Sequence, residues 1–121
     1  MLETLNKDME ALGINYAFME WCANPVYPYF VGEYAEDDPL TEDGAMESTF
    51  ILTGFTRRSW GDLENVKNEI LSYYGTTGKT VITDVGSAVA IFYAGSQPVP
   101  TGDAELKKIQ INLKVKEWKV I

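Results

Sequence analysis

The chain has 121 residues, of which 45% are hydrophobic and 23% charged, so its length and composition are those of one folded domain rather than of a disordered chain. Its formal net charge of −8 disfavours nonspecific binding to nucleic acid, because such binding depends on lysine and arginine side chains that neutralise phosphates. The absence of histidine and the single cysteine, Cys22, exclude an internal disulfide and a cluster of histidine and cysteine metal ligands.

The N-terminal segment predicts a short amphipathic helix. Its apolar residues recur at helical spacing, and Gly13 follows them as a C-terminal cap. The residues that set this spacing are Leu2, Leu5, Met9 and Leu12. Such a helix needs a partner for its apolar side, and a sheet is the only large partner that the rest of the sequence offers.

Three strands are predicted next. Residues 14–21 and 26–34 are rich in aromatic and β-branched side chains, and Pro28, which has no backbone donor, is expected at a strand end, an edge or a bulge. Residues 35–45 read as a polar loop rich in acidic and turn-forming residues. The third strand, residues 47–56, is apolar at both parities, which indicates burial on both faces and a central place in the sheet.

A second helix follows the third strand. Ser59 and Asp62 form a helix-start signal, in which the Ser59 side chain accepts from the backbone amide three residues on and Asp62 reaches back toward it. Leu63, Val66, Ile70 and Tyr73 then form an apolar stripe, and Gly75 is expected to end the helix.

Three further strands are predicted, over residues 79–84, 88–94 and about 108–116. In the last of them apolar residues alternate with lysines, and a row of lysines is typical of a protected sheet edge. The alternation shifts after Lys116, which puts Trp118 and Val120 on the polar side. A bulge near Glu117 or a second contact surface would explain this shift.

These elements predict a single α+β domain over residues 1–121. Two helices are expected to pack on one face of a mostly antiparallel sheet, in the order α-β-β-β-α-β-β-β. The core is expected to contain apolar residues from both helices and from several strands. The predicted core residues are Leu5, Met9, Phe50, Leu52, Leu63, Val66, Ile70, Ile91, Ile111 and Leu113.

The sequence offers few groups for catalysis. Cys22 has no histidine to activate it, and no serine lies in a Gly-x-Ser-x-Gly turn. The acidic residues between Glu33 and Glu47 lie among turn residues, where nothing buries them, although a weak divalent-cation site or a partner site there stays an alternative. We therefore expect no catalytic residue, no cofactor and no metal site, and a protein that is not an enzyme.

Three places are candidates for contact with another chain. An arginine pair before the second helix suits bidentate pairing with a carboxylate, with an ordinary solvated turn as the alternative. The loop over residues 95–103 is longer than a tight hairpin needs and has a stiff apolar tip, so it is either a contact arm or a plain surface loop. The chain end beyond the last strand is the third. The candidate contact residues are Arg57, Arg58, Gln97, Pro98, Val99, Pro100, Trp118 and Val120.

Two motifs carry a family resemblance. Residues 27–34 read Tyr-Pro-Tyr-Phe-Val-Gly-Glu-Tyr, and residues 50–56 read Phe-Ile-Leu-Thr-Gly-Phe-Thr, shortly before the helix start at Ser59. With the N-terminal helix, this pattern resembles the small tail-terminator and neck proteins of long-tailed bacteriophages and their prophage relatives. The resemblance extends from Leu2 to about Val115.

The resemblance implies a structural protein that forms a ring, typically a hexamer, caps the finished tail tube and joins it to the head. It implies the tail tube protein and the head–neck connector as partners, and no catalytic residues. It places the protein in the tail or neck of the virion, and in the host cytoplasm during assembly. Members of the family use an inter-strand loop at the ring surface, for which residues 95–103 are the candidate.

Several alternatives stay open. The chain could be a head-closure or neck adaptor protein, or a tail-tube subunit, which would polymerise instead of stopping at a closed ring. An acidic inhibitor that mimics DNA belongs to another class and would carry its carboxylates along one surface. Because the chain is acidic, we expect a monomer when it is free at low salt, no sequence-specific binding to nucleic acid and no membrane segment.

Overall fold

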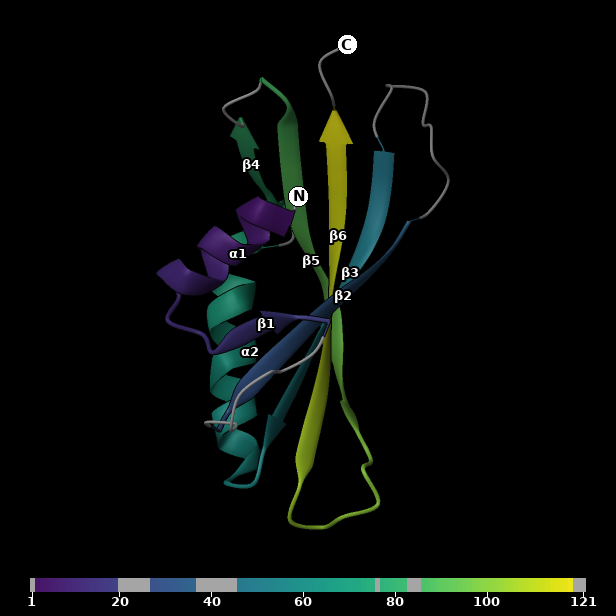
Figure 1. Ribbon diagram of the computed structural model, residues 1–121. Coiled ribbons are helices and arrows are strands. Elements are labelled where there is room, and N and C mark those ends of the chain that lie inside the picture. Colours follow the sequence, from purple (N-terminus) through teal and green to yellow (C-terminus); the bar gives the residue numbers. More distant parts are fainter. Residues whose placement is uncertain (1, 20–26, 37–45, 76, 83–85, 119–121) are drawn as a thin grey trace.

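The computed structural model describes residues 2–19, 27–36, 46–75, 77–82 and 86–118 (Figure 1). The strands form one six-stranded sheet in the order β1-β2-β3-β6-β5-β4. The elements in chain order are α1 (Leu2–Ala11), β1 (Tyr16–Phe18), β2 (Tyr29–Glu36), β3 (Met46–Thr56), α2 (Trp60–Tyr74), β4 (Lys79–Ile82), β5 (Ala88–Val99) and β6 (Lys107–Trp118).

The predicted fold class, two helices packed on a mostly antiparallel sheet, is wrong. Of the residues that the structure describes, 51% are in strands and 26% in helices, and the sheet is curled and mixed. It is mixed because β1 runs parallel to β2, with Tyr16 opposite Phe30. The sequence pattern shows where strands lie but not their direction, so it did not distinguish this parallel pair from an antiparallel one.

One continuous core lies between the helices and the sheet. In Figure 1, α1 and α2 lie on the same side of the sheet. Alternate residues of β3 and β6 point into this core, as their burial patterns show. The predicted core is confirmed: nine of its ten residues are buried, and Val66 is partly buried against them. The period-two and helical patterns of apolar residues therefore located the core correctly.

Two glycines on the core side allow phenylalanine rings to lie across neighbouring strands. A Cβ atom on Gly54 would lie 2.2 Å from Cε2 of Phe30, which stands directly opposite in β2. A Cβ atom on Gly32 would lie 2.5 Å from Cζ of Phe50. Both rings are fully buried, so at these two positions glycine provides space for a core aromatic ring.

The ends of α2 differ in part from the prediction. Ser59 is the N-cap, but its side chain makes no capping hydrogen bond; the backbone amide of Asp62 instead donates to the Ser59 carbonyl at 3.2 Å. Gly75 ends the helix with φ of 67°, as expected of a C-terminal glycine. Pro28 directly precedes β2, so its predicted place at a strand end is confirmed.

β6 is a central strand, so the predicted sheet edge is wrong. It pairs with β3 on one side and with β5 on the other. Its pairing with β3 continues without a shift to Glu117, which excludes the bulge expected there. The irregularity lies in β5, between Tyr93 and Gly95. Lys108, Lys114 and Lys116 of β6 therefore line one face of the sheet, and Trp118 shares their parity.

Candidate functional site

The β5–β6 hairpin extends one end of the sheet (Figure 1). Residues 95–99, predicted to be a loop, continue β5 and pair with Lys108–Asn112, because the bulge after Tyr93 lets the strand pass Gly95. Only residues 100–106 connect the two strands. The expected loop is therefore wrong over its first half, and the candidate contact arm is a long hairpin with a short tip.

The free edge of this hairpin is interrupted by a proline. β4 pairs with β5 only over Ala88–Ile91, and no other described strand pairs with residues 95–99 on that side. Pairing with β6 continues on both sides of Pro98, so its nitrogen belongs at the free edge, where it has no hydrogen to donate. Pro98 therefore disfavours the addition of another strand at this edge, which favours a partner that contacts the side chains of the hairpin.

The structure brings Arg57 to the hairpin tip. Its Nη1 donates to Asp103 Oδ2 at 3.3 Å, and hydrogen bonds with Tyr27 and Asp103 raise the pKa of Arg57. The pKa of Asp103 is lowered first by the backbone amide of Glu105 and then by Arg57. A pocket of about 390 Å³ lies between the tip and Trp60, and Val99 and Pro100 help to line it.

The other predicted contact residues lie apart from this tip. Arg58 is exposed, and its backbone amide donates to Thr56 Oγ1 at 3.1 Å. Gln97 is exposed within β5. Trp118 is at the far end of β6 from the tip (Figure 1). Val120 and residues 37–45 of the acidic loop lie outside the described residues. The sequence thus predicted the residues at the hairpin tip, which the structure brings together, and several other residues that the structure places elsewhere.

The sheet face opposite the helices forms a second candidate site, here called the outer face. It consists of Tyr29 and Val31 of β2, Ile51, Thr53 and Phe55 of β3, and Lys108, Lys114 and Lys116 of β6. All of these residues are half-buried. The central place of β3 is confirmed, but burial of both of its faces is not, because the helices of the chain cover only one.

Aromatic rings and a cation lie together at one end of the outer face. The ring centres of Tyr29 and Phe55 are 5.2 Å apart and stacked, and Tyr27 lies 5.6 Å from Tyr29. Lys108 Nζ lies 5.6 Å from the centre of the Phe55 ring. Burial, followed by the neighbouring Tyr27, raises the pKa of Tyr29 against the opposing effect of Arg57. This end of the face is thus apolar and weakly cationic.

A buried polar cluster joins α1 to α2 and β4. Asp8 is only 6% exposed and accepts hydrogen bonds from Tyr73 at 3.0 Å and from Tyr74 at 2.8 Å. Lys79 Nζ lies 3.5 Å from Asp8 Oδ1 and also contacts the Tyr73 hydroxyl. Burial opposes the charge of Lys79, but the hydrogen bond with Tyr73 and the charge of Asp8 outweigh it, so its pKa is raised.

The sequence contained a signal for this cluster that the prediction did not use. Asp8 follows Leu5 by three residues, so it lies on the apolar side of the first helix. A carboxylate in that position needs a partner. The partners come from residues 65 or more positions away in the sequence, and periodicity does not identify such partners.

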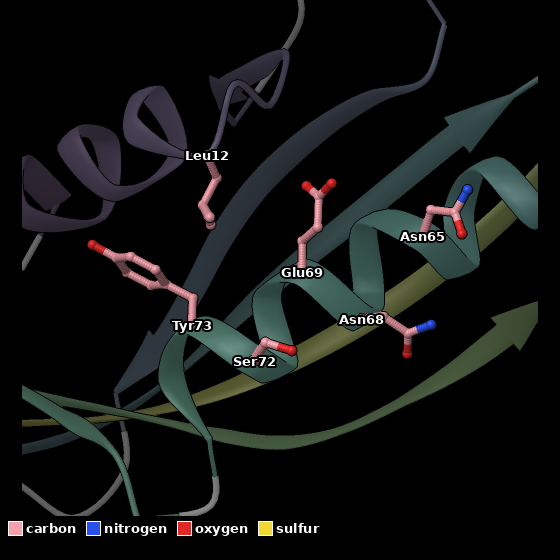
Figure 2. Close-up of a pocket in the computed structure, with 6 residues that line it drawn as sticks. All are labelled: Leu12, Asn65, Asn68, Glu69, Ser72 and Tyr73. Atoms are coloured by element: carbon pink, nitrogen blue, oxygen red, sulfur yellow. The ribbon is translucent and has the colours of Figure 1, made fainter.

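A shallow open groove of about 680 Å³ runs beside α2. Figure 2 shows Asn65, Asn68, Glu69 and Ser72 along the helix, with Leu12 opposite them beyond the end of α1. Its lining is mostly polar and uncharged, with one acid. The side of the molecule that carries the helices therefore differs in character from the outer face.

The buried phenols predict a loss of stability at alkaline pH. Burial raises the pKa of Tyr16 to about 12, and burial with the charge and hydrogen bond of Asp8 raises that of Tyr74. Above the ordinary tyrosine pKa of 10.0 the unfolded chain releases these protons while the folded chain retains them. The contribution is therefore complete below pH 10 and is lost as pH rises toward about 12.

Thermal unfolding between pH 8 and 12 tests this prediction. Tm should fall more steeply above pH 10 than below it, and Tyr16→Phe should flatten the fall because the phenol is gone. Tyr34→Phe is the matched control, since that ring is 42% exposed. Equal slopes for the wild type and for Tyr16→Phe would contradict the prediction.

Comparison with known proteins adds nothing to the fold and the site geometry described above. No protein-family model matches the chain, and a search of curated protein sequences gives no match. Neither α1 nor α2 is long and apolar enough to cross a membrane. Within the described ranges, no three acidic or cysteine side chains form a group that could hold a metal ion.

Proposed function

We propose that this chain is a structural subunit of a long-tailed bacteriophage or prophage particle, a tail terminator that forms a closed ring, caps the tail tube and joins it to the head. Its partners are further copies of itself, the tail tube protein and the head–neck connector. It has no catalytic activity of its own. It occurs in the host cytoplasm during assembly and then in the neck of the virion.

The observation that carries the proposal is the open outer face. The apolar side chains of Ile51 and Phe55 lie there on a central strand, on the face that neither α1 nor α2 covers. A central strand with apolar residues on both faces is suited to burial by another chain. The resemblance of residues 27–34 and 50–56 to tail-terminator proteins is the reason for naming a phage tail as the assembly. These two segments overlap β2 and β3, which contribute to the outer face.

The hairpin tip supplies a second support. Its apolar residues Val99 and Pro100 border a pocket with Trp60, which is 45% exposed. The Arg57–Asp103 ion pair fastens the tip to the end of β3. An arm held in one orientation loses less conformational entropy when it binds than a mobile loop does. This favours the tip as the contact with the tail tube or with the connector.

A tip replacement tests the proposed function. Val99 and Lys108 already pair, so replacing residues 100–107 by Asn-Gly closes the hairpin with a two-residue turn, and the only paired residue that it removes is Lys107 at the very start of β6. The replacement starts at residue 100 because Gln97–Val99 are paired strand residues. We expect circular dichroism to show a folded chain and electron microscopy to show overlong tails that do not join heads.

Thr77→Ala, at an exposed residue between α2 and β4 that belongs to neither the tip nor the helices, is the control for this experiment and should leave tails unchanged. Tails of uniform length that join heads despite the tip replacement would contradict the role of the tip. Normal virions from phage that lack the chain altogether would contradict the proposed function itself.

The alternatives predict other results. A tail-tube subunit is also favoured by the open outer face, and its loss would remove the tubes rather than lengthen them. A DNA mimic is disfavoured, because Lys108, Lys114 and Lys116 cover the centre of the outer face. That row would repel a protein surface that binds phosphates.

A further inference from the structure

The outer face and the helical side of the molecule carry opposite charge. The strands place Lys108, Lys114 and Lys116 on the outer face against two acids, Glu33 and Glu47, a net charge of +1. Lys116 pairs with Glu47 at 3.4 Å, and Lys108 lies over the Phe55 ring. The lysines thus border the apolar residues of β3, as charged residues border the apolar centre of a protein interface.

The helical side is acidic. The exposed or half-buried charged residues of α1 and α2 are five acids and two lysines, a net charge of −3: Glu3, Lys7, Glu10, Asp62, Glu64, Lys67 and Glu69. Glu69 lines the groove beside α2, with Leu12 opposite it (Figure 2). The acids and the outer-face lysines are on opposite sides of one sheet, so they do not neutralise each other within a chain.

We propose that the occupant of the outer face is the helical side of a second copy of this chain. The contact rests on the proposed ring assembly and names the two surfaces that meet in it. It is heterologous, because one surface of a copy binds a different surface of the next. A heterologous contact continues from copy to copy until the rotation closes a ring, whereas a contact between two outer faces would bring six lysines together and would stop at a dimer.

Nucleic acid is the other candidate occupant, because aromatic rings can stack on bases and lysines can bind phosphates. The observations favour a protein partner. Tyr29 and Phe55 stack on each other, Tyr27 lies 5.6 Å from Tyr29, and Lys108 Nζ lies over Phe55, so both half-buried rings already have neighbours where a base would stack. Glu33 and Glu47 also lie on this face and would repel phosphates.

Charge reversal on the two surfaces tests the contact. A sheet variant carries Lys108→Glu and Lys114→Glu, and a helix variant carries Glu10→Lys and Glu69→Lys. Each should weaken self-association by about tenfold or more in sedimentation velocity at low salt, because like charges then face each other. An equimolar mixture should restore association, and so should one chain that carries all four substitutions.

The helix variant separates this contact from the effect of net charge. It lowers the magnitude of the net charge, which on its own would favour association. The four-substitution chain has the wild-type net charge of −8. Added salt should weaken the wild-type contact and abolish the difference between wild type and variants.

Crosslinking captures the same contact when the free chain is mainly monomeric. In a Cys22→Ser background, Glu69→Cys and Lys114→Cys in one chain should give a ladder of multimers with a short bis-maleimide, and either cysteine alone should not. A lack of multimers, or variants that associate like the wild type, would overturn the proposal. Binding of fluorescent oligo(dT) that the sheet variant loses would assign the face to nucleic acid and overturn it as well.

The outcomes distinguish this contact from the proposed function. If charge reversal acts as expected but phage lacking the chain forms normal virions, the contact stands and the tail-terminator role fails. If the virion needs the chain and the reversed variants still form multimers, the role stands and another surface forms the ring.

Discussion

Replacing Asp8 with alanine is expected to lower the free energy of unfolding by about 3 kcal/mol, as removal of one partner from a buried ion pair does elsewhere. The substitution leaves the Tyr74 hydroxyl, which is buried, without the acceptor that lies 2.8 Å away in the wild type. It also removes the carboxylate beside Lys79. That side chain is 37% exposed and regains water, so we expect the lower end of the usual range.

Urea denaturation measures this effect against two matched variants. Asp8→Asn keeps an acceptor oxygen and should cost less than Asp8→Ala, since the phenols stay hydrogen-bonded. Glu10→Ala removes an exposed acid two residues further along the same helix and should change stability by less than about 0.5 kcal/mol. An Asp8→Ala effect as small as that of Glu10→Ala would show that the cluster does not hold α1 in place.

Replacing Gly54 with alanine is expected to destabilise the chain by about 1–3 kcal/mol, although alanine is favoured over glycine in most strands. The new Cβ atom would lie 2.2 Å from Cε2 and 2.5 Å from Cζ of Phe30. The Phe30 ring is fully buried in the core, so it cannot turn aside without disturbing its neighbours.

Gly61→Ala is the matched control for this substitution. It lies in the first turn of α2, and the nearest atom to its Cβ would be Ser59 Oγ at 3.5 Å. The same chemical change should there stabilise the chain by about 0.5–1 kcal/mol. Midpoints in urea for both variants test the pair. A Gly54→Ala variant as stable as the wild type would show that the two strands move apart without cost.

The sequence located elements and core residues well because both depend on local periodicity. Leu5 and Met9 in the first helix, and Ile111 and Leu113 in the last strand, were placed correctly for this reason. Strand direction and neighbours depend on contacts that are distant in the sequence. The parallel pairing of β1 with β2 and the central place of β6 therefore required the structure.

The sequence also did not show how far each strand extends. Gly95 read as the end of a strand, but the bulge between Tyr93 and Gly95 lets β5 continue to Val99. The candidate site was predicted in fragments for a related reason. Arg57 and the tip residues were both recognised, yet nothing in the sequence shows that Asp103 would join them.

The closeness of Phe30 to Gly54 also constrains how the chain can evolve. The two residues stand opposite each other in β2 and β3, where the ring occupies the volume that a side chain on residue 54 would need. A larger residue at 54 therefore becomes acceptable only after residue 30 becomes smaller. We expect homologous chains to vary together at these two positions, and an alignment would show this as covariation of a large–small pair.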